Sequence, residues 1–340
     1  MTDLEFGVFD WIDVNRKRTI AETYDDRIAI ARRADAGAFE RIHFAEHHGA
    51  TIGLDASPGL FAAAVARETQ RIKLAPMTFI VPLYDPLRLV QEIAMIDALS
   101  HGRLELGIGK GSSPHEAAMF GFTAEDMQAR YDAFVPAILE ALATGVFVSP
   151  ITGERVELTI TPSGPFTYWY PTSNPESIQK AAEHGQNTIF GFAFKSPPVE
   201  VIRERRDIYF AARDALGDTA TGSPRFGILR HVIVAETDEK AYEIAEQAFV
   251  DHYDNFTWLW RKHGTPQPPI PDLRELVENG LFFVGSPESV AEQVTSIVKA
   301  TGVNYVAAAF AWGSLDIADS LTSIDLFDTK VIPAVLAAID

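Results

Sequence analysis

Short apolar runs alternate with longer segments of helical period along this chain, and this order restricts the fold more than any other feature. Strands are predicted at 5–9, 41–44, 72–80, 104–108, 168–170, 188–192, 226–235 and 304–309, and helices at 21–36, 59–69, 86–99, 124–144, 175–184, 198–216, 239–260 and 287–300. About eight such alternations predict parallel strands joined by helical crossovers. A (β/α)8 barrel closes such a sheet without edges, whereas a doubly wound open sheet is the alternative.

The glycine motifs favour the barrel. No G-x-G-x-x-G motif opens an early helix, and the run from Gly107 to Gly111 has the wrong spacing both for that motif and for G-x-x-x-x-G-K-[ST]. One barrel can also contain all 340 residues. We therefore predict an α/β fold, a (β/α)8 TIM barrel that forms a single domain over 1–340. Two insertions are expected, a hairpin at 146–166 and a loop or lid at 258–283, where Gly264 to Pro271 contains four prolines.

Composition excludes several classes of protein. The chain has no cysteine, which excludes disulfides and thiolate metal sites. Its formal net charge of -18 argues against nucleic acid or an anionic membrane as a partner, because both require basic patches. The acidic N-terminus does not resemble a signal peptide, and no apolar run approaches the ~20 residues of a membrane span. A soluble cytoplasmic protein is expected.

The run Ala45-Glu46-His47-His48 directly follows the strand predicted at 41–44. In barrel enzymes the ends of strands carry the chemistry, and histidine changes its charge near neutral pH. The residues alone allow a general acid or base, a metal site or a packed polar cluster. Adjacent histidines on an extended chain point to opposite sides, so a shared metal ion is disfavoured. His43 lies within the strand and is expected to be structural.

Two further turns could bind a phosphate. Gly107 to Ser113 combines flexible glycine backbone with the cation of Lys110, although a tight turn with a surface lysine is the alternative. At Ser173 to Ser177, Asn174 is the expected N-cap of a helix whose free N–H groups suit an anion. An ordinary capped helix is the alternative there. Both turns follow strands of one predicted sheet, which strengthens the phosphate interpretation.

Several motifs in the same order resemble those of the bacterial luciferase-like flavin monooxygenase family. They are Phe6-Gly7-Val8-Phe9, Ala45-Glu46-His47-His48, Val81-Pro82-Leu83-Tyr84-Asp85-Pro86-Leu87-Arg88, Asp97-Ala98-Leu99-Ser100-His101-Gly102-Arg103, Gly107-Ile108-Gly109-Lys110-Gly111, Ser113-Pro114-His115-Glu116, Arg230-His231-Val232 and Val284-Gly285-Ser286-Pro287-Glu288. The resemblance extends over nearly the whole chain. It implies a (β/α)8 barrel with a flavin at the C-terminal face of the strands.

The resemblance also implies an activity. Members are typically two-component monooxygenases, in which a separate NAD(P)H:flavin reductase supplies reduced FMN as a diffusible cosubstrate. The flavin then reacts with O2 to form a C4a-peroxide that oxygenates a small organic substrate. The alternative within the fold is an F420-dependent oxidoreductase that transfers hydride. A metal-dependent barrel hydrolase is disfavoured because metal-ligand spacings are missing. A homodimer is expected, with the helices after the second and third strands as the interface.

Individual roles carry over by motif as expectations. His47 resembles the catalytic histidine near the flavin, and Glu46 would lie beside it. Met77 and Thr78 fall where the family often has a non-prolyl cis peptide against the flavin ring. The remaining cofactor positions are Lys110, Ser173, Asn174 and Ser177 for the phosphate, Gly109, Gly111 and Ser112 for the ring or ribityl chain, and Phe192 for the far wall. Lys110 departs from the arginine of many members, which removes bidentate binding but keeps the charge. His231 is a further candidate for the pocket wall.

Overall fold

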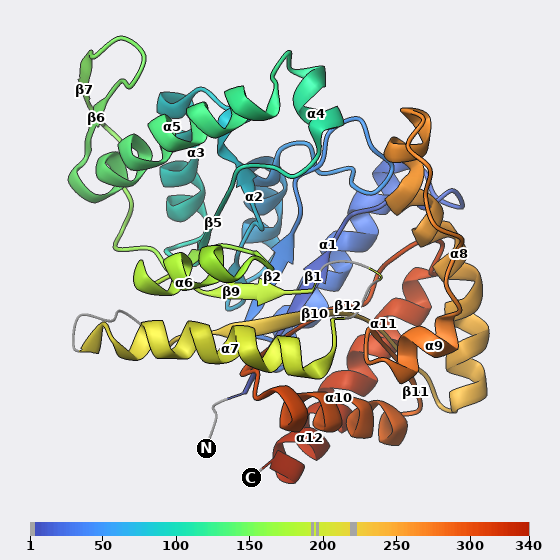
Figure 1. Cartoon of the computed structure of the whole chain (residues 1–340). Coiled ribbons are helices and arrows are strands. Elements are labelled where there is room, and N and C mark those ends of the chain that lie inside the picture. The colour runs from blue at the N-terminus through green and yellow to red at the C-terminus, as the bar shows by residue number, and fades with distance from the viewer. Residues whose placement is uncertain (1–3, 192–193, 195–196, 218–222, 340) are drawn as a thin grey trace.

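The computed structural model describes residues 4–191, 194, 197–217 and 223–339, and its centre is a closed parallel barrel (Figure 1). Its eight strand positions are β1 (Glu5–Asp10), β2 (Arg41–Phe44), β3 (Lys73–Leu74) continued by β4 (Phe79–Ile80), β5 (Leu106–Gly109), β8 (Tyr168–Trp169), β9 (Thr188–Phe190), β10 (Phe226–Val234) and β12 (Tyr305–Ala309). Successive strands pair in parallel, and β12 returns to β1. Single bridges, Leu74 to Leu104 and Trp169 to Asn187, complete the ring. The predicted barrel is thus confirmed.

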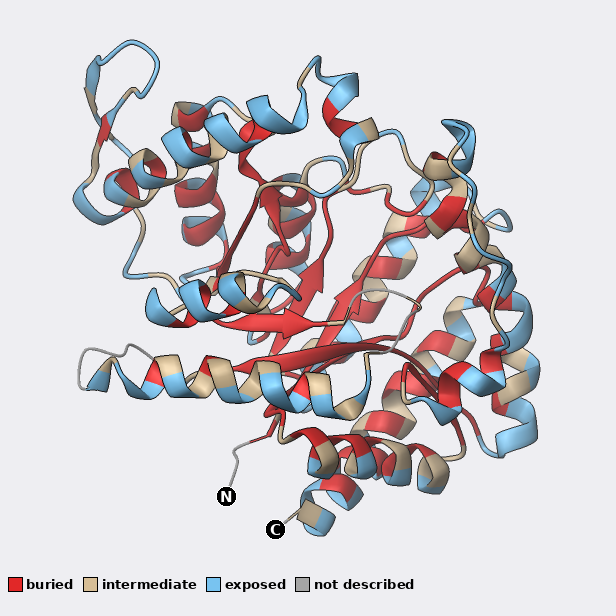
Figure 2. Ribbon diagram, viewed as in Figure 1, coloured by how far each residue is buried: buried red, intermediate tan, exposed pale blue. Residues whose placement is uncertain are grey.

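Helices surround the barrel and turn their apolar faces inward (Figure 2). They are α1 (Ile20–Ala36), α2 (Pro58–Glu68), α3 (Pro86–Leu99), α4 (Pro114–Met119), α5 (Ala124–Thr144), α6 (Pro175–Glu183), α7 (Val199–Asp214), α8 (Asp238–Lys262), α9 (Leu273–Glu278), α10 (Pro287–Thr301), α11 (Ile317–Leu326) and α12 (Ile332–Ile339). A 3-10 turn η1 (Val81–Leu83) and a π turn η3 (Phe327–Val331) interrupt the pattern. None of the described helices is long and apolar enough to cross a bilayer.

Local sequence explains where these helices begin. Thr19 and Glu22 form a reciprocal capping box at the start of α1, which satisfies two backbone N–H groups that the helix leaves free. At α3, the Asp85 side chain accepts a hydrogen bond from the Arg88 N–H, and Pro86 occupies the first turn, where its missing N–H costs nothing. The predicted bounds of α3 agree with the structure because these signals are local.

The structure corrects two predicted elements. The strand expected at 72–80 is two short strands, although Ala75 and Met77 between them still donate backbone hydrogen bonds to Ile42 and Phe44 of β2. The insertion expected at 258–283 is shorter than predicted, since α8 continues to Lys262 and an extra strand, β11 (Phe282–Gly285), lies at its far end. β11 pairs in parallel with the second half of β10, from His231 to Val234, whereas β9 pairs with its beginning. The irregular loop is therefore only 263–272.

An antiparallel hairpin of β6 (Val146–Val148) and β7 (Arg155–Glu157) lies within the range expected for the first insertion. It follows α5 and projects from the body of the protein (Figure 1). Val148 and Ile151 expose about half or more of their surface there. The hairpin is far from the ends of the strands that form the site described below.

Charged and aromatic side chains fill the N-terminal end of the barrel. Arg41 forms ion pairs with Glu5 and Glu105, and the latter also accepts a hydrogen bond from the Trp169 indole at 2.6 Å. His43 bonds the Ala75 carbonyl through Nδ1 and the Tyr305 hydroxyl through Nε2. Burial lowers the pKa of His43 to about 3, so it stays neutral. These contacts give His43 the structural position expected from its place within a strand.

Candidate functional site

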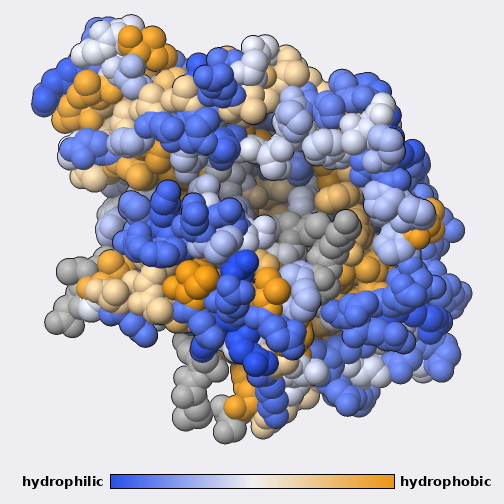
Figure 3. Space-filling view, in the orientation of Figure 1, coloured by the Kyte–Doolittle hydropathy of each residue, from blue (hydrophilic) through white to orange (hydrophobic). Residues whose placement is uncertain are grey.

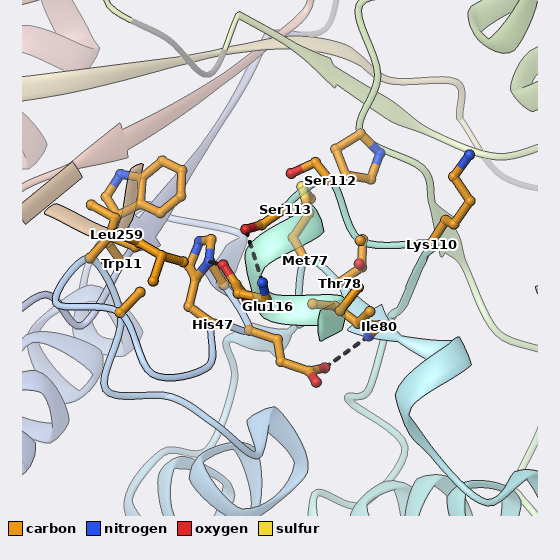
Figure 4. A pocket seen from close by; sticks show the side chains of 18 of the residues that line it. Trp11, His47, Met77, Thr78, Ile80, Lys110, Ser112, Ser113, Glu116 and Leu259 are labelled. Carbon is orange, nitrogen blue, oxygen red and sulfur yellow. Dashed lines mark hydrogen bonds and ion pairs between the residues drawn. The ribbon is translucent and has the colours of Figure 1, made fainter. Parts of the chain in front are cut away.

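A cavity of about 880 Å³ opens at the C-terminal ends of the barrel strands. The segments that follow β1, β2, β3, β5, β8 and β9 contribute to its wall, and the end of α8 with the loop after it closes one side. In the space-filling view the surface is hollowed below α4 (Figure 3). Since the strands all run in the same direction, residues distant in sequence meet at this one rim. The close-up shows several of them (Figure 4).

His47 and Glu116 form a hydrogen-bonded pair in this cavity. His47 follows β2, and its Nδ1 lies 3.1 Å from Oε1 of Glu116. Oε2 of the same carboxylate accepts the backbone N–H of His48, also at 3.1 Å. The His47 side chain is 22% exposed and lines the cavity, and within the described residues its Nε2 has no hydrogen-bond partner. The pair is therefore able to exchange a proton with a molecule in the cavity.

Glu116 was not predicted from the sequence. It belongs to a Ser113-x-x-Glu116 run that reads as a capping box, in which the glutamate would turn back to the N-cap. Ser113 does cap α4, accepting the Glu116 N–H at 3.3 Å. The Glu116 carboxylate instead turns to His47, and its side chain is only 7% exposed. The sequence did contain a signal for Glu116. Its carboxylate follows the glycine-rich turn, at a strand end of the same predicted sheet as His47.

Glu46 is held in place by three hydrogen bonds. Its Oε2 accepts the Ile80 N–H at 2.8 Å and the Tyr84 hydroxyl at 3.0 Å, while Oε1 lies 2.8 Å from Nε2 of His48. Burial, followed by the charge of Glu46, raises the pKa of the Tyr84 phenol. With a side chain that is 1% exposed, Glu46 connects β2 to the start of η1. Its predicted catalytic role stays a prediction.

Two closely packed backbone segments form the floor of the cavity. The peptide bond between Met77 and Thr78 is cis, as the resemblance led us to expect. Both residues line the cavity, and so does Gly109 from the neighbouring strand. A Cβ atom at Gly109 would lie 2.1 Å from Oγ1 of Thr78, and one at Gly107 would lie 1.9 Å from the Pro76 carbonyl oxygen. These two glycines are therefore required for the strands to approach.

One end of the cavity carries a cation and hydroxyl groups. Lys110, Gly111, Ser112, Thr172 and Ser173 line it, and Lys110 Nζ donates a hydrogen bond to Gln128 at 2.7 Å. Asn174 and Ser177 do not line the cavity. Asn174 is the N-cap of α6, where its side chain accepts the Ser177 N–H at 3.1 Å. Whether either contacts a cofactor stays a prediction.

The opposite end is aromatic and apolar. Trp11 follows β1, and its ring lies 5.8 Å from that of His47 and 6.4 Å from that of Phe256 on α8. Leu259 and Trp260 continue this wall, and Thr265 and Gln267 from the 263–272 loop complete it. Figure 4 shows Trp11 and Leu259 on one side and Lys110 on the other, with Met77 and Thr78 between them. The predicted wall residue Phe192 lies outside the described residues.

Stacked aromatic rings connect the aromatic wall of the cavity to α4. His115, next to Glu116, stacks on His263 with ring centroids 4.3 Å apart and planes inclined by 11°. Its edge also meets Trp260 at 5.0 Å. Since His263 ends α8, this contact joins the last turn of that helix to the segment that carries Glu116.

His231 does not line the main cavity. It faces a small separate space behind Trp11 and Phe256, where its ring lies 4.5 Å from that of His252. Burial lowers the pKa of His231, and His252 bonds the buried Asp13 carboxylate at 3.0 Å. Across the described part of the chain, no group of three or more histidine, aspartate or glutamate side chains is placed to hold a metal ion.

Comparison with known proteins identifies the family. The model of the luciferase-like monooxygenase family matches residues 4–305. An uncharacterized protein, y4wF of Sinorhizobium fredii, is 32% identical over 94% of this chain and 93% of its own length. The oxygenase component of the flavin-dependent trigonelline monooxygenase of Acinetobacter baylyi is 27% identical, over 76% of this chain and 72% of that protein.

Solved structures give the same fold. The oxygenating constituent of 3,6-diketocamphane monooxygenase from Pseudomonas putida, in complex with FMN, superimposes with a TM-score of 0.81 at 21% identity, covering 97% of this chain and 98% of that one. An F420-dependent secondary alcohol dehydrogenase superimposes with a TM-score of 0.69 at 14% identity, covering 98% and 99%. Both the sequence relatives and the solved structures include proteins that are named as monooxygenases. From the match over residues 4–305, the chain belongs to the luciferase-like monooxygenase family.

Proposed function

We propose that this protein is the oxygenase component of a two-component FMN-dependent monooxygenase that acts on a small organic substrate. The observation that carries the proposal is the His47–Glu116 pair, which faces the cavity that also contains the Met77–Thr78 floor and the Lys110 end. When bound, reduced FMN supplies the electrons that activate O2. The protein's own residues bind and orient the FMN and the substrate, and they exclude water from the cavity.

The residues present fit FMN. The cavity is large enough for a flavin and a small molecule together. Lys110, Ser112 and Ser173 would hold the phosphate, because a cation and hydroxyl donors suit a dianion. Gly109 and Gly111 line the cavity, where their backbone would lie along the ring and the ribityl chain, and Met77 and Thr78 would support the ring. Phe192 and the pair Asn174 and Ser177 remain expected contacts from the resemblance.

His47 is proposed as the group that moves a proton. Glu116 accepts the Nδ1–H of His47, which selects this tautomer and leaves the Nε2 lone pair directed at the cavity. In that form Nε2 removes a proton from a bound molecule, and the nearby carboxylate stabilises the imidazolium that results. Trp11 and Leu259 exclude water from the same region. Glu116 is thus a positioning residue for His47.

The proposal includes two partners. A separate NAD(P)H:flavin reductase would supply reduced FMN, as the name of the trigonelline relative, an oxygenase component, suggests. A second copy of the chain would cover α2 and α3. Leu60 on α2 is 74% exposed, and Met95 and Leu99 on α3 are 50% and 39% exposed, which supports an interface there.

Anaerobic titration tests the cofactor. Flavin-free protein is titrated with reduced FMN and, in parallel, with reduced F420, and each complex then receives a pulse of O2 under rapid-scan absorbance. The proposal expects saturable binding of reduced FMN and a transient absorbance that belongs to neither reduced nor oxidised flavin. Binding of F420 alone, with no oxygen-dependent transient, would move the protein to hydride transfer and contradict the proposal.

His47→Ala tests the site. Flavin binding should change little, because the His47 side chain is at the aromatic end, whereas turnover should fall roughly 100-fold or more. His184→Ala is the matched control, since this exposed histidine caps α6 far from the cavity wall. Unchanged turnover in His47→Ala would remove the catalytic assignment.

A further inference from the structure

We infer that the substrate is an uncharged, largely apolar organic molecule, and that the end of α8 with the 263–272 loop selects it. The inference rests on the proposed function, because it assigns the Lys110 end of the cavity to the FMN phosphate. What remains for a substrate is the end formed by Trp11, Leu259 and Trp260. We refer to this end as the aromatic end.

No lysine or arginine of the described residues is available at the aromatic end. Among the described residues that line the cavity, Lys110 is the only lysine or arginine, and it lies on the far side of Met77 and Thr78 (Figure 4). The last turn of α8 does contain two cations, but both are held outside. Arg261 pairs with Asp254, and Lys262 lies over the ring of Trp258, 4.6 Å from its centroid. A carboxylate, sulfonate or phosphate on the substrate would find no permanently charged partner here, because His47 is already paired with Glu116.

The charge that does reach this end is negative. Glu116 lies beside His47 with its side chain 7% exposed. An anionic substrate group would have to lose its hydration and also approach this carboxylate, and both steps disfavour binding. A cation would be attracted to the carboxylate, but Glu116 already receives two N–H groups, from His47 and from His48. An uncharged molecule avoids both the desolvation cost of an ion and the competition for Glu116.

The polar groups of the wall suit a single hydrogen-bonding function on the substrate. Thr265 and Gln267 are half-buried in the loop and line the cavity. The loop has a defined shape, because the Thr265 N–H bonds the Trp260 carbonyl at 2.9 Å and the Tyr253 hydroxyl bonds the Pro268 carbonyl at 2.5 Å. The Gln267 amide nitrogen donates to the Thr265 and Pro266 carbonyls at 3.3 and 3.2 Å, so the Thr265 hydroxyl and the Gln267 Oε1 are the groups that can orient a carbonyl or hydroxyl while the rings contact the apolar part.

Calorimetric titration with matched ligand sets tests the inference. Each set has one carbon skeleton (cyclohexyl, naphthyl or decyl) carrying a methyl ketone, a carboxylate or a trimethylammonium group. The ketone should bind at least tenfold more tightly than the carboxylate and the ammonium compound in at least one set. A carboxylate or ammonium compound that binds best, or the absence of binding by every ketone, would overturn the inference.

The titration is done with flavin-free protein and with protein saturated with FMN. The flavin-free arm separates the two proposals. If FMN fails to bind but the ketones are preferred, the proposed function fails, whereas the inference that the aromatic end prefers uncharged molecules still holds. If FMN binds as proposed and the carboxylates are preferred, only the substrate inference fails.

Charge insertion provides a second test. Leu259→Arg places a cation at the aromatic end and should improve carboxylate binding at least tenfold while weakening ketone binding. Val250→Arg is the matched control, because Val250 is on the same helix and 50% exposed, so it adds equal charge without changing preference. If Leu259→Arg does not fold, Gln267→Arg on the loop replaces it. A folded variant with unchanged preference would contradict the inference.

Discussion

Replacing Asp55 by asparagine should stabilise the protein above neutral pH and leave its stability at acidic pH nearly unchanged. Asp55 lies directly behind the site, since its backbone carbonyl accepts the His47 N–H at 3.1 Å. Its side chain is buried, with one oxygen accepting the Ser57 N–H and the other, Oδ2, without a hydrogen-bond partner. Burial, and then the charges of Glu46 and Asp10, raise the pKa of Asp55 to about 8.

The magnitude follows from proton linkage. The folded protein holds the Asp55 proton up to about pH 8, whereas the unfolded chain releases it near the ordinary aspartate pKa of 3.8. The stability due to this group is complete below the unfolded pKa and is lost as pH rises through the folded pKa. A difference of about four pKa units corresponds to a loss on the order of 5 kcal/mol between pH 4 and pH 8. Asparagine has the same shape and no charge, so the variant should escape this loss.

Urea unfolding at pH 5 and at pH 8.5 measures the effect. The free energy of unfolding of Asp55→Asn should exceed that of the unmodified protein by several kcal/mol more at pH 8.5 than at pH 5. Asp25→Asn is the control, because Asp25 is an exposed residue of α1. Comparing each variant with the parent also cancels the contribution of buried acids that do not interact with Asp55. An equal difference at the two pH values would refute the reasoning.

Three other substitutions test the site. Glu116→Gln should lower kcat roughly 10- to 100-fold with little change in FMN affinity, because it removes the charge behind His47. Rapid-mixing turnover measures kcat and flavin titration measures the affinity, and an unchanged kcat would contradict the pairing of Glu116 with His47. Gly107→Ala should cost about 1–3 kcal/mol in urea unfolding, since its Cβ would overlap a backbone carbonyl, whereas Gly164→Ala, with open space around it, should change stability by less than about 0.5 kcal/mol. Lys110→Ala should weaken FMN binding by about tenfold or more but leave riboflavin binding unchanged, because riboflavin has no phosphate; an equal loss for both flavins would exclude a phosphate contact.

The barrel was predictable because its signals are local and repeated. Strand and helix periods alternate along the whole chain, and residues such as Thr123 and Gly145 mark the ends of α5 by their capping chemistry. The strand order then follows from the rule that parallel crossovers place successive strands side by side. The helix α9 and the strand β11 were missed because both come after the proline-rich loop, within or at the end of the stretch that was interpreted as one insertion up to residue 283.

The site was predictable only as far as each residue could be placed at a strand end. His47 comes shortly after β2, Gly109 is the last residue of β5 and Lys110 is the next residue, so their arrival in one cavity required only the barrel. The pairing of Glu116 with His47 joins positions 69 residues apart and depends on how a side chain turns at the start of α4. Sequence patterns carry no information on that rotation. The same is true of the three hydrogen bonds that hold Glu46, which its motif did not indicate, while its catalytic role stays a prediction.

The division of the cavity between two parts of the chain has a consequence for engineering. Every residue proposed to hold FMN comes from the first 192 residues, whereas most of the aromatic end comes from one continuous segment, Phe256 to Gln267. That segment is anchored by Tyr253 and by the stack of His115 on His263. Exchanging it as a cassette between relatives, with these anchors kept, should transplant the preference for a substrate without rebuilding the oxygen chemistry. New specificities in this fold could therefore arise by recombination of a short stretch of DNA rather than by scattered point changes.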